Sequence, residues 1–216
     1  MNRKEIKELA KAKIKGNKWN IIWPMLIIQV IQSILTRILG GTVNIDINNL
    51  ESLESIQVSP KVYFSSFVVS LIIGVITAGY IKYILNFVRT GEFDTDSILE
   101  TIKAKWVDVL VATILTSIII GLCTALFVVP GIIMALAYAF TTLLVIDTDV
   151  SGSDSLKASR EMMKGYKWNY FVFGLSFIGW ALLIPFTFGL ILIWLYPYMV
   201  VANTLYYEEL KKVTKK

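Results

Sequence analysis

The side chains best able to make specific polar interactions lie inside an apolar stretch near the start of the chain. Two amides, two hydroxyls and a guanidinium recur there at helical spacing, at Gln29, Gln32, Ser33, Thr36 and Arg37. Residues three and four apart share one face of a helix. If this stretch crosses a membrane, its polar groups either line a cavity for a bound molecule or hydrogen-bond to a neighbouring helix. Both interpretations stay open on the sequence.

Catalytic and metal-binding side chains are scarce in this chain. It has no histidine, which is the commonest general base and the commonest zinc ligand, and it has a single cysteine, Cys123. Asp108 and Asp147 stand at the ends of apolar runs, and neither a Walker A loop nor a Gly-x-Gly-x-x-Gly loop occurs. We therefore expect a protein that is not an enzyme and that holds neither a metal nor a cofactor.

The elements that would position the polar stripe are long apolar runs. Hydrophobic residues make up 56% of the 216 residues and charged residues only 17%, against about 25% in soluble domains. A run of about 20 apolar residues is long enough to cross a bilayer as a helix. We expect one all-α membrane domain over 1–216 with six transmembrane helices, at about 19–39, 62–87, 107–129, 132–146, 168–184 and 188–206.

A repeated motif indicates how these spans are grouped. Lys15-Gly16-Asn17-Lys18-Trp19-Asn20 returns as Lys164-Gly165-Tyr166-Lys167-Trp168-Asn169, and a shorter form covers 103–108. Tryptophan beside lysine anchors a helix at the headgroup layer, so the predicted anchors are Lys18, Trp19, Lys105, Trp106, Lys167 and Trp168. Each copy opens a pair of spans, which predicts three hairpins in a pseudo-threefold parallel repeat, at 19–87, 95–146 and 153–206. The alternative is that such pairs recur only because each interface needs an anchor.

Short amphipathic interfacial helices are expected before the first, third and fifth spans. In 1–18, Ile6, Ala10 and Ile14 share one face and lysines cover the other. This pattern predicts a helix on the membrane surface, with its apolar face in lipid and its basic face toward anionic headgroups, or else a solvated tail. Ser97 and Glu100 have capping-box spacing for the second such helix. Residues 207–216 are expected to form a cytoplasmic tail.

Small residues and prolines indicate packing contacts and bends. Two spans carry a small residue at every fourth position, the spacing that lets helices approach closely in lipid, at Ser66, Ser70, Gly74, Ala78, Ser117, Gly121 and Ala125. Pro130 and Gly131 predict a tight hairpin turn, and Pro197 predicts a kink in the last span.

The charge distribution predicts the orientation of the chain. All but two of the 21 basic residues, Arg37 and Lys61, fall in segments that six crossings would place on the same side as both termini. Because positive residues favour the cytoplasmic side, we expect a multi-pass protein of the cytoplasmic membrane with both termini inside. This topology accounts for the net charge of +5 without nucleic acid as a partner.

Several blocks of the chain are typical of a known family. They are Pro130-Gly131-Ile132-Ile133, 159–165 with Lys167-Trp168, 175–180, Tyr196-Pro197-Tyr198 and Tyr206-Tyr207-Glu208. With the motif at 15–19, these blocks resemble the bacterial DUF975 family of integral membrane proteins of unknown function. The family pattern often has histidine where this chain has Tyr166. The resemblance implies a bacterial multi-pass protein of the cytoplasmic membrane, and it assigns no reaction.

Two functions from different classes fit these observations. In the first, the protein transports or binds a small molecule, lipid or peptide in a polar cavity that includes the stripe from Gln29 to Arg37. In the second, it is a structural or interaction protein in the envelope, engaged in stress or in protection against membrane-active peptides, with a membrane or peptide partner. A hydrated cavity that reaches Gln29 would favour the first function, and a dry core packed with small residues would favour the second.

Overall fold

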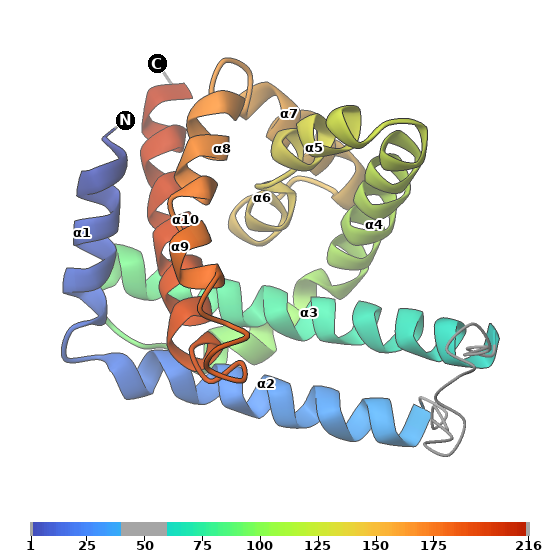
Figure 1. Ribbon diagram of the computed structural model, residues 1–216, viewed down its shortest axis with the longest axis horizontal. Helices are drawn as coiled ribbons and strands as arrows, with labels where there is room; N and C mark the ends of the chain where they lie inside the picture. Colours follow the sequence, from blue (N-terminus) through green and yellow to red (C-terminus); the bar gives the residue numbers. More distant parts are fainter. Residues whose placement is uncertain (1, 40–59, 215–216) are drawn as a thin grey trace.

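The computed structural model describes residues 2–39 and 60–214, and these residues form ten α-helices and no strand. The loop expected over 42–61 therefore lies almost wholly outside the described residues. Two long antiparallel helices, α2 (Lys18–Leu39) and α3 (Pro60–Thr90), extend away from the rest of the molecule (Figure 1). Helices α1 (Arg3–Ile14) and α10 (Leu192–Thr214) lie side by side, so the two described ends of the chain meet at one corner (Figure 1).

Two tyrosines of α3 join this helix to α2. The Tyr83 hydroxyl donates to the carbonyl of Asn20 at 2.9 Å, and the Tyr80 hydroxyl donates to the carbonyl of Ile21 at 3.0 Å. Pro24 lies in the second turn of α2 and has no N–H for the carbonyl of residue 20. Tyr83 therefore replaces the hydrogen bond that the proline removes, and α2 runs on to Leu39 as the sequence predicts.

The two full copies of the repeated motif fold in the same way. Gly16 and Gly165 both have positive φ, at 95° and 84°, and each precedes a helix start by two residues. The N–H groups of Asn17 and Tyr166 each donate to the carbonyl three residues earlier, at 3.0 and 3.1 Å. The left-handed conformation favours glycine, which has no Cβ. The glycine of the motif thus turns the chain from one helix into the next.

The third copy makes no such turn. Helix α4 runs without a break over Asp96–Leu126, so the prediction of a separate interfacial helix before the third span is wrong. The physical reason is local. The shorter copy has no glycine, because Lys103 lies three residues before Trp106 where the full copies have Gly16 and Gly165, and lysine and alanine are good helix formers. The start of α4 also differs from the expected capping box, because the Asp94 carboxylate accepts from the N–H groups of Asp96 and Ser97.

The hairpin after α4 bends earlier than expected. The break is at Phe127, which is extended with φ −154°, and Pro130 and Gly131 lie inside the first turn of α5 (Val128–Ala137). A proline costs little in a first turn because its N–H would have no helical partner there. Gly131 serves close packing instead, since a Cβ on it would stand 2.1 Å from Thr124 Oγ1. A turn at residues 138–140 then leads into α6 (Thr141–Asp147).

The last third of the chain departs most from the expected spans. Helix α7 (Gly152–Met162) begins at the Ser151 cap, whose hydroxyl accepts from the N–H of Asp154. Helix α8 (Lys167–Leu175) and helix α9 (Ile178–Ala181) are short, and turns fill 182–191 before α10. Pro197 lies within α10, which continues to Thr214. The prediction of six spans in three equivalent hairpins is therefore not confirmed.

Helix α1 does not use its apolar face for lipid. Ile6, Ala10 and Ile14 are buried, and α1 packs against α10. The Tyr198 hydroxyl donates to the carbonyl of Lys7 at 3.5 Å, and the Lys7 ammonium donates to Ser176 and lies over the Phe177 ring. The prediction that the apolar face of 1–18 rests in the membrane is wrong, because the protein itself covers that face.

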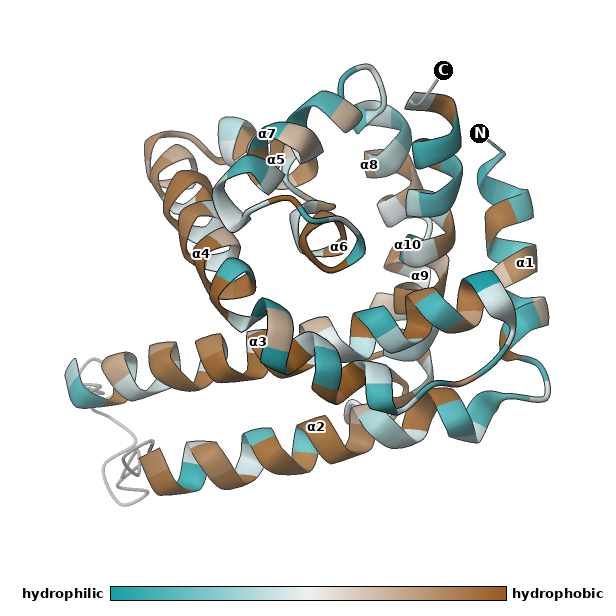
Figure 2. Cartoon of the chain, turned by 180° about the vertical axis from the view of Figure 1, so that it is seen from behind, coloured by the Kyte–Doolittle hydropathy of each residue, from teal (hydrophilic) through white to brown (hydrophobic). Residues whose placement is uncertain are grey.

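Four stretches of the described chain are long and apolar enough to cross a membrane, namely α2, α3, α4 and the segment Val128–Asp147, which contains α5 and α6. Apolar residues dominate α4 and the outer parts of α2 and α3, whereas polar residues gather on α1, α7 and the end of α10 (Figure 2). Tyr206, Phe140 and Phe173 form an aromatic core between α6, α8 and α10. The centroid of the Tyr206 ring lies 6.0 Å from that of Phe140 and 5.0 Å from that of Phe173. This core holds the short helices against the long ones.

Candidate functional site

A groove of about 520 Å³ lies between α2, α3, α4 and α6. Eleven of the described residues line it; seven of them carry a hydroxyl or an amide, and none carries a charge. The polar members are Gln32, Thr36, Ser66, Ser70, Thr77, Thr113 and Thr142. Since these helices are among the most apolar of the chain, this is an unusual concentration of polar groups within the candidate membrane spans.

Helical spacing explains how α2 and α3 supply most of the lining. Gln32 and Thr36 are four residues apart on α2, and Ser66, Ser70 and Gly74 follow at the same interval on α3. A Cβ built on Gly74 would meet nothing within 4 Å, so its missing side chain leaves open space beside the polar groups. Of the small residues predicted to pack helices together on α3, Ser66, Ser70 and Gly74 therefore line the groove, whereas Ala78 is buried and does not line it.

The polar stripe of α2 divides into two groups. Gln32 and Thr36 line the groove, whereas Gln29, Ser33 and Arg37 are exposed outside it. The Ser33 hydroxyl donates to the carbonyl of Gln29 at 2.9 Å, so it is used within its own helix. The groove thus reaches the stripe one turn beyond Gln29 and does not include Gln29, the residue whose contact with a hydrated cavity would favour the transport hypothesis.

The other predicted packing residues lie elsewhere on the surface. Ser117, Gly121 and Ala125 are exposed on α4, and a Cβ on Gly121 would meet nothing within 4 Å. The anchors Trp19, Trp106 and Trp168 are exposed by half or more, while Lys105 donates to Asp149 at 3.3 Å. Their role at the headgroup layer stays a prediction. Among residues 2–39 and 60–214, no three histidine, cysteine or acidic side chains come together as a metal site would require.

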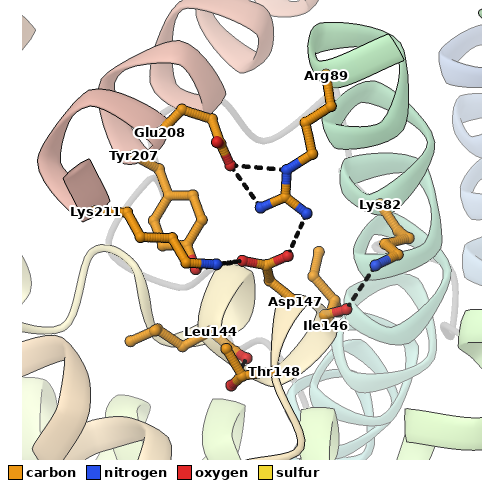
Figure 3. Close-up of polar contacts among 9 residues, drawn as sticks. All are labelled: Lys82, Arg89, Leu144, Ile146, Asp147, Thr148, Tyr207, Glu208 and Lys211. Atoms are coloured by element: carbon orange, nitrogen blue, oxygen red, sulfur yellow. Dashed lines mark hydrogen bonds and ion pairs between the residues drawn. The ribbon is translucent and has the colours of Figure 1, made fainter. Parts of the chain in front are cut away.

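A charged cluster that the sequence did not predict joins the C-terminal ends of α3, α6 and α10. Asp147, whose side chain is only 2% exposed, accepts from Arg89 at 2.5 Å, from the Tyr207 hydroxyl at 2.8 Å, and from Lys211 (Figure 3). Arg89 also donates to Glu208 at 2.6 and 3.0 Å. Burial and the neighbouring Asp147 raise the pKa of Tyr207, so its hydroxyl stays protonated and donates. The cluster is structural in form, because every charge in it has a partner.

A lysine completes this end of α6. Lys82 of α3 donates to the carbonyl of Ile146 at 3.1 Å, and the Thr148 hydroxyl donates to the carbonyl of Leu144 (Figure 3). The last carbonyls of a helix have no helical partners and carry partial negative charge. Asp147 was noticed in the sequence only as an aspartate at the end of an apolar run. Its partners lie 58 to 64 residues away, and no local pattern connects them.

A helical chain with four stretches able to cross a bilayer, and with a neutral polar groove between them, belongs to the class of membrane proteins. The family described as proteins of unknown function (DUF975) matches residues 1–143 and 126–214, and the chain belongs to that family. This confirms the resemblance seen in its sequence blocks. No curated protein and no solved structure matches the chain.

Proposed function

We propose that this protein binds a small uncharged polar molecule in the groove between α2, α3, α4 and α6 and serves its transport through the membrane. The single observation that carries the proposal is the set of seven neutral polar side chains gathered there from four helices. A volume of about 520 Å³ lies within the range of small-molecule sites, roughly 300–1,000 Å³. Gln32 and Thr36 are exposed, which leaves the groove open along α2.

The chemistry of the lining selects the class of molecule. An ion that entered the groove would lose hydration without gaining a counter-charge from the described residues that line it, because none of them is lysine, arginine, aspartate or glutamate. Hydroxyl and amide groups can each both donate and accept hydrogen bonds, and they suit a solute with several hydroxyl or amide groups of its own. Polyols, neutral sugars and small amides are the compounds to test.

We place the protein in the bacterial cytoplasmic membrane with both termini on the inner side. Two observations support this topology. The basic residues are concentrated between the apolar runs on one side. An even number of crossings puts both termini on one side of the membrane, and the ends of the described chain lie together at α1 and α10 (Figure 1). A four-crossing core of α2 to α6, with α7 to α10 packed on it, fits these observations better than three equivalent hairpins.

Gln32→Leu tests the binding site, with Gln29→Leu as its matched control. Both substitutions remove one amide from α2, but only Gln32 lines the groove. We expect at least one of the polyols, neutral sugars and small amides tested to raise the melting temperature of the wild-type protein in lipid nanodiscs. Gln32→Leu should weaken its binding by about tenfold, the value of one or two hydrogen bonds, and Gln29→Leu should leave binding unchanged. Calorimetric titration of the three proteins measures the affinities.

Two results would contradict the proposal. In one, no uncharged solute of the panel binds the wild-type protein. In the other, a solute binds but both leucine variants bind it with wild-type affinity, which would place its site elsewhere in the molecule.

A further inference from the structure

A second hollow lies at the turn between α7 and α8, on a different surface from the polar groove. Its volume is about 690 Å³, and Lys157, Arg160, Lys164 and Lys167 line it together with Glu161. We propose that this hollow binds the phosphate headgroup of an anionic phospholipid, and that one acyl chain of the lipid lies in the apolar groove beside α8. The proposal is independent of the function proposed for the polar groove.

The backbone turn at Gly165 creates the cluster of positive charge. Lys157, Arg160 and Lys164 follow at intervals of three and four, which places them on one side of α7 and its extension. The turn at Gly165, where φ is 84°, brings Lys167 to the same hollow. Within the described residues, no ion pair engages Arg160, Lys164 or Lys167, and Lys157 has one exposed contact of 3.9 Å. Three cations without an ion pair, and a fourth with one long exposed contact, therefore remain available to an anion.

Trp168 indicates that the hollow lies at headgroup depth. Its side chain lines the hollow and is 73% exposed. A tryptophan with an apolar ring and one N–H donor favours the layer between lipid headgroups and acyl chains. Lysine and arginine at that depth meet lipid phosphates. A phosphate of the bilayer is thus the anion nearest to this cluster.

A second groove gives the lipid chain its place. It has a volume of about 390 Å³ and is lined mainly by apolar side chains of α5, α8, α9 and α10, among them Leu136, Phe171, Leu175 and Met199. Trp168 connects the two hollows, because its ring lies 5.5 Å from that of Phe171. Gly174 lies in the groove with open space at its Cβ position. A groove of this composition suits an acyl chain and does not suit a soluble anion.

The charges at the hollow are tested by the triple variant Arg160→Gln, Lys164→Gln, Lys167→Gln. Its matched control, Lys4→Gln, Lys11→Gln, Lys15→Gln, removes the same charge from exposed positions on α1 and its end. Native mass spectrometry of the full chain in detergent would compare retention of phosphatidylglycerol and of phosphatidylethanolamine with the same acyl chains. We expect the wild-type protein to prefer phosphatidylglycerol by at least about tenfold, the first variant to lose this preference, and the control to keep it.

The acyl groove is tested without a change of charge. Gly174→Leu fills the groove and should weaken phosphatidylglycerol retention by about threefold or more, whereas Gly121→Leu, at an open position on α4, should not. Inorganic phosphate at millimolar concentration should fail to compete with the lipid. Equal loss in the two triple variants would overturn the proposal, because general surface charge would then explain binding. If phosphate competed effectively with the lipid, or if Gly174→Leu retained phosphatidylglycerol as well as the wild-type protein does, a phospholipid would not be the occupant of the hollow.

Discussion

Replacing Asp147 with alanine is expected to lower the free energy of unfolding by about 3 kcal/mol, the largest effect of any single change proposed for this protein. Removing one partner of a buried ion pair typically costs about 3–5 kcal/mol, because the remaining charges lose their compensation. The Asp147 side chain is 2% exposed, while those of Arg89 and Lys211 are 33% and 20% exposed. Partial hydration of these two cations, and the contact of Arg89 with Glu208, should keep the loss near the lower value.

Asp149→Ala is the matched control for this prediction. Asp149 lies two residues further along the chain, and its side chain is fully exposed, with Lys105 as its partner at 3.3 Å. An exposed ion pair contributes at most about 1 kcal/mol, and often less. Unfolding both variants in mixed micelles with increasing sodium dodecyl sulfate would measure the difference. Equal stability of the two variants would show that the cluster of α3, α6 and α10 does not stabilise the fold.

Gly152→Ala is expected to destabilise the protein by about 1–3 kcal/mol through overpacking between α4 and α7. A Cβ on Gly152 would stand 2.3 Å from the backbone carbonyl oxygen of Asp108 and 3.0 Å from Val111 Cβ. The carbonyl belongs to a continuous helix, so the two helices must separate. Separation would also weaken the hydrogen bond from the Gly152 N–H to Asp108 Oδ1, now 2.9 Å long, which places the effect toward the higher value.

Gly121→Ala provides the comparison, because a Cβ at Gly121 would meet nothing within 4 Å. Alanine is favoured over glycine within a helix by about 1 kcal/mol, so this substitution should leave stability unchanged or raise it slightly. The same detergent titration, with circular dichroism to follow helix content, distinguishes the two variants. A Gly152→Ala protein as stable as the wild type would mean that α7 does not press against α4 at this point.

Local sequence signals determined several parts of the fold correctly. The apolar runs at 19–39 and 62–87 correspond to α2 and α3 within a few residues. The glycines of the two full motif copies adopt the same left-handed conformation. Each of these features depends on residues within one or two turns of each other. Their energies are therefore decided by short stretches of chain, which a sequence displays directly.

The incorrect predictions concern how far a local signal extends. The lysine-tryptophan pair at 105–106 resembles the other anchors, yet α4 continues through it because no glycine precedes the pair to turn the chain. Pro130 and Gly131 are typical of a hairpin turn, but Phe127 takes the extended conformation and Gly131 is used for contact with Thr124. Residues 182–191 form turns within an apolar stretch that predicted spans, since hydropathy reports the surroundings of a segment and not its backbone conformation.

The sequence by itself determined that α2 carries a polar stripe, and only the tertiary structure decided which part of it faces other helices. The rotation of α2 against α3, α4 and α6 places Gln32 and Thr36 in the groove and leaves Gln29, Ser33 and Arg37 outside it. The cluster around Asp147 and the cover that α10 provides for Ile6, Ala10 and Ile14 likewise join distant segments. Helical spacing assigns residues to a face, but the packing of whole helices decides what that face contacts.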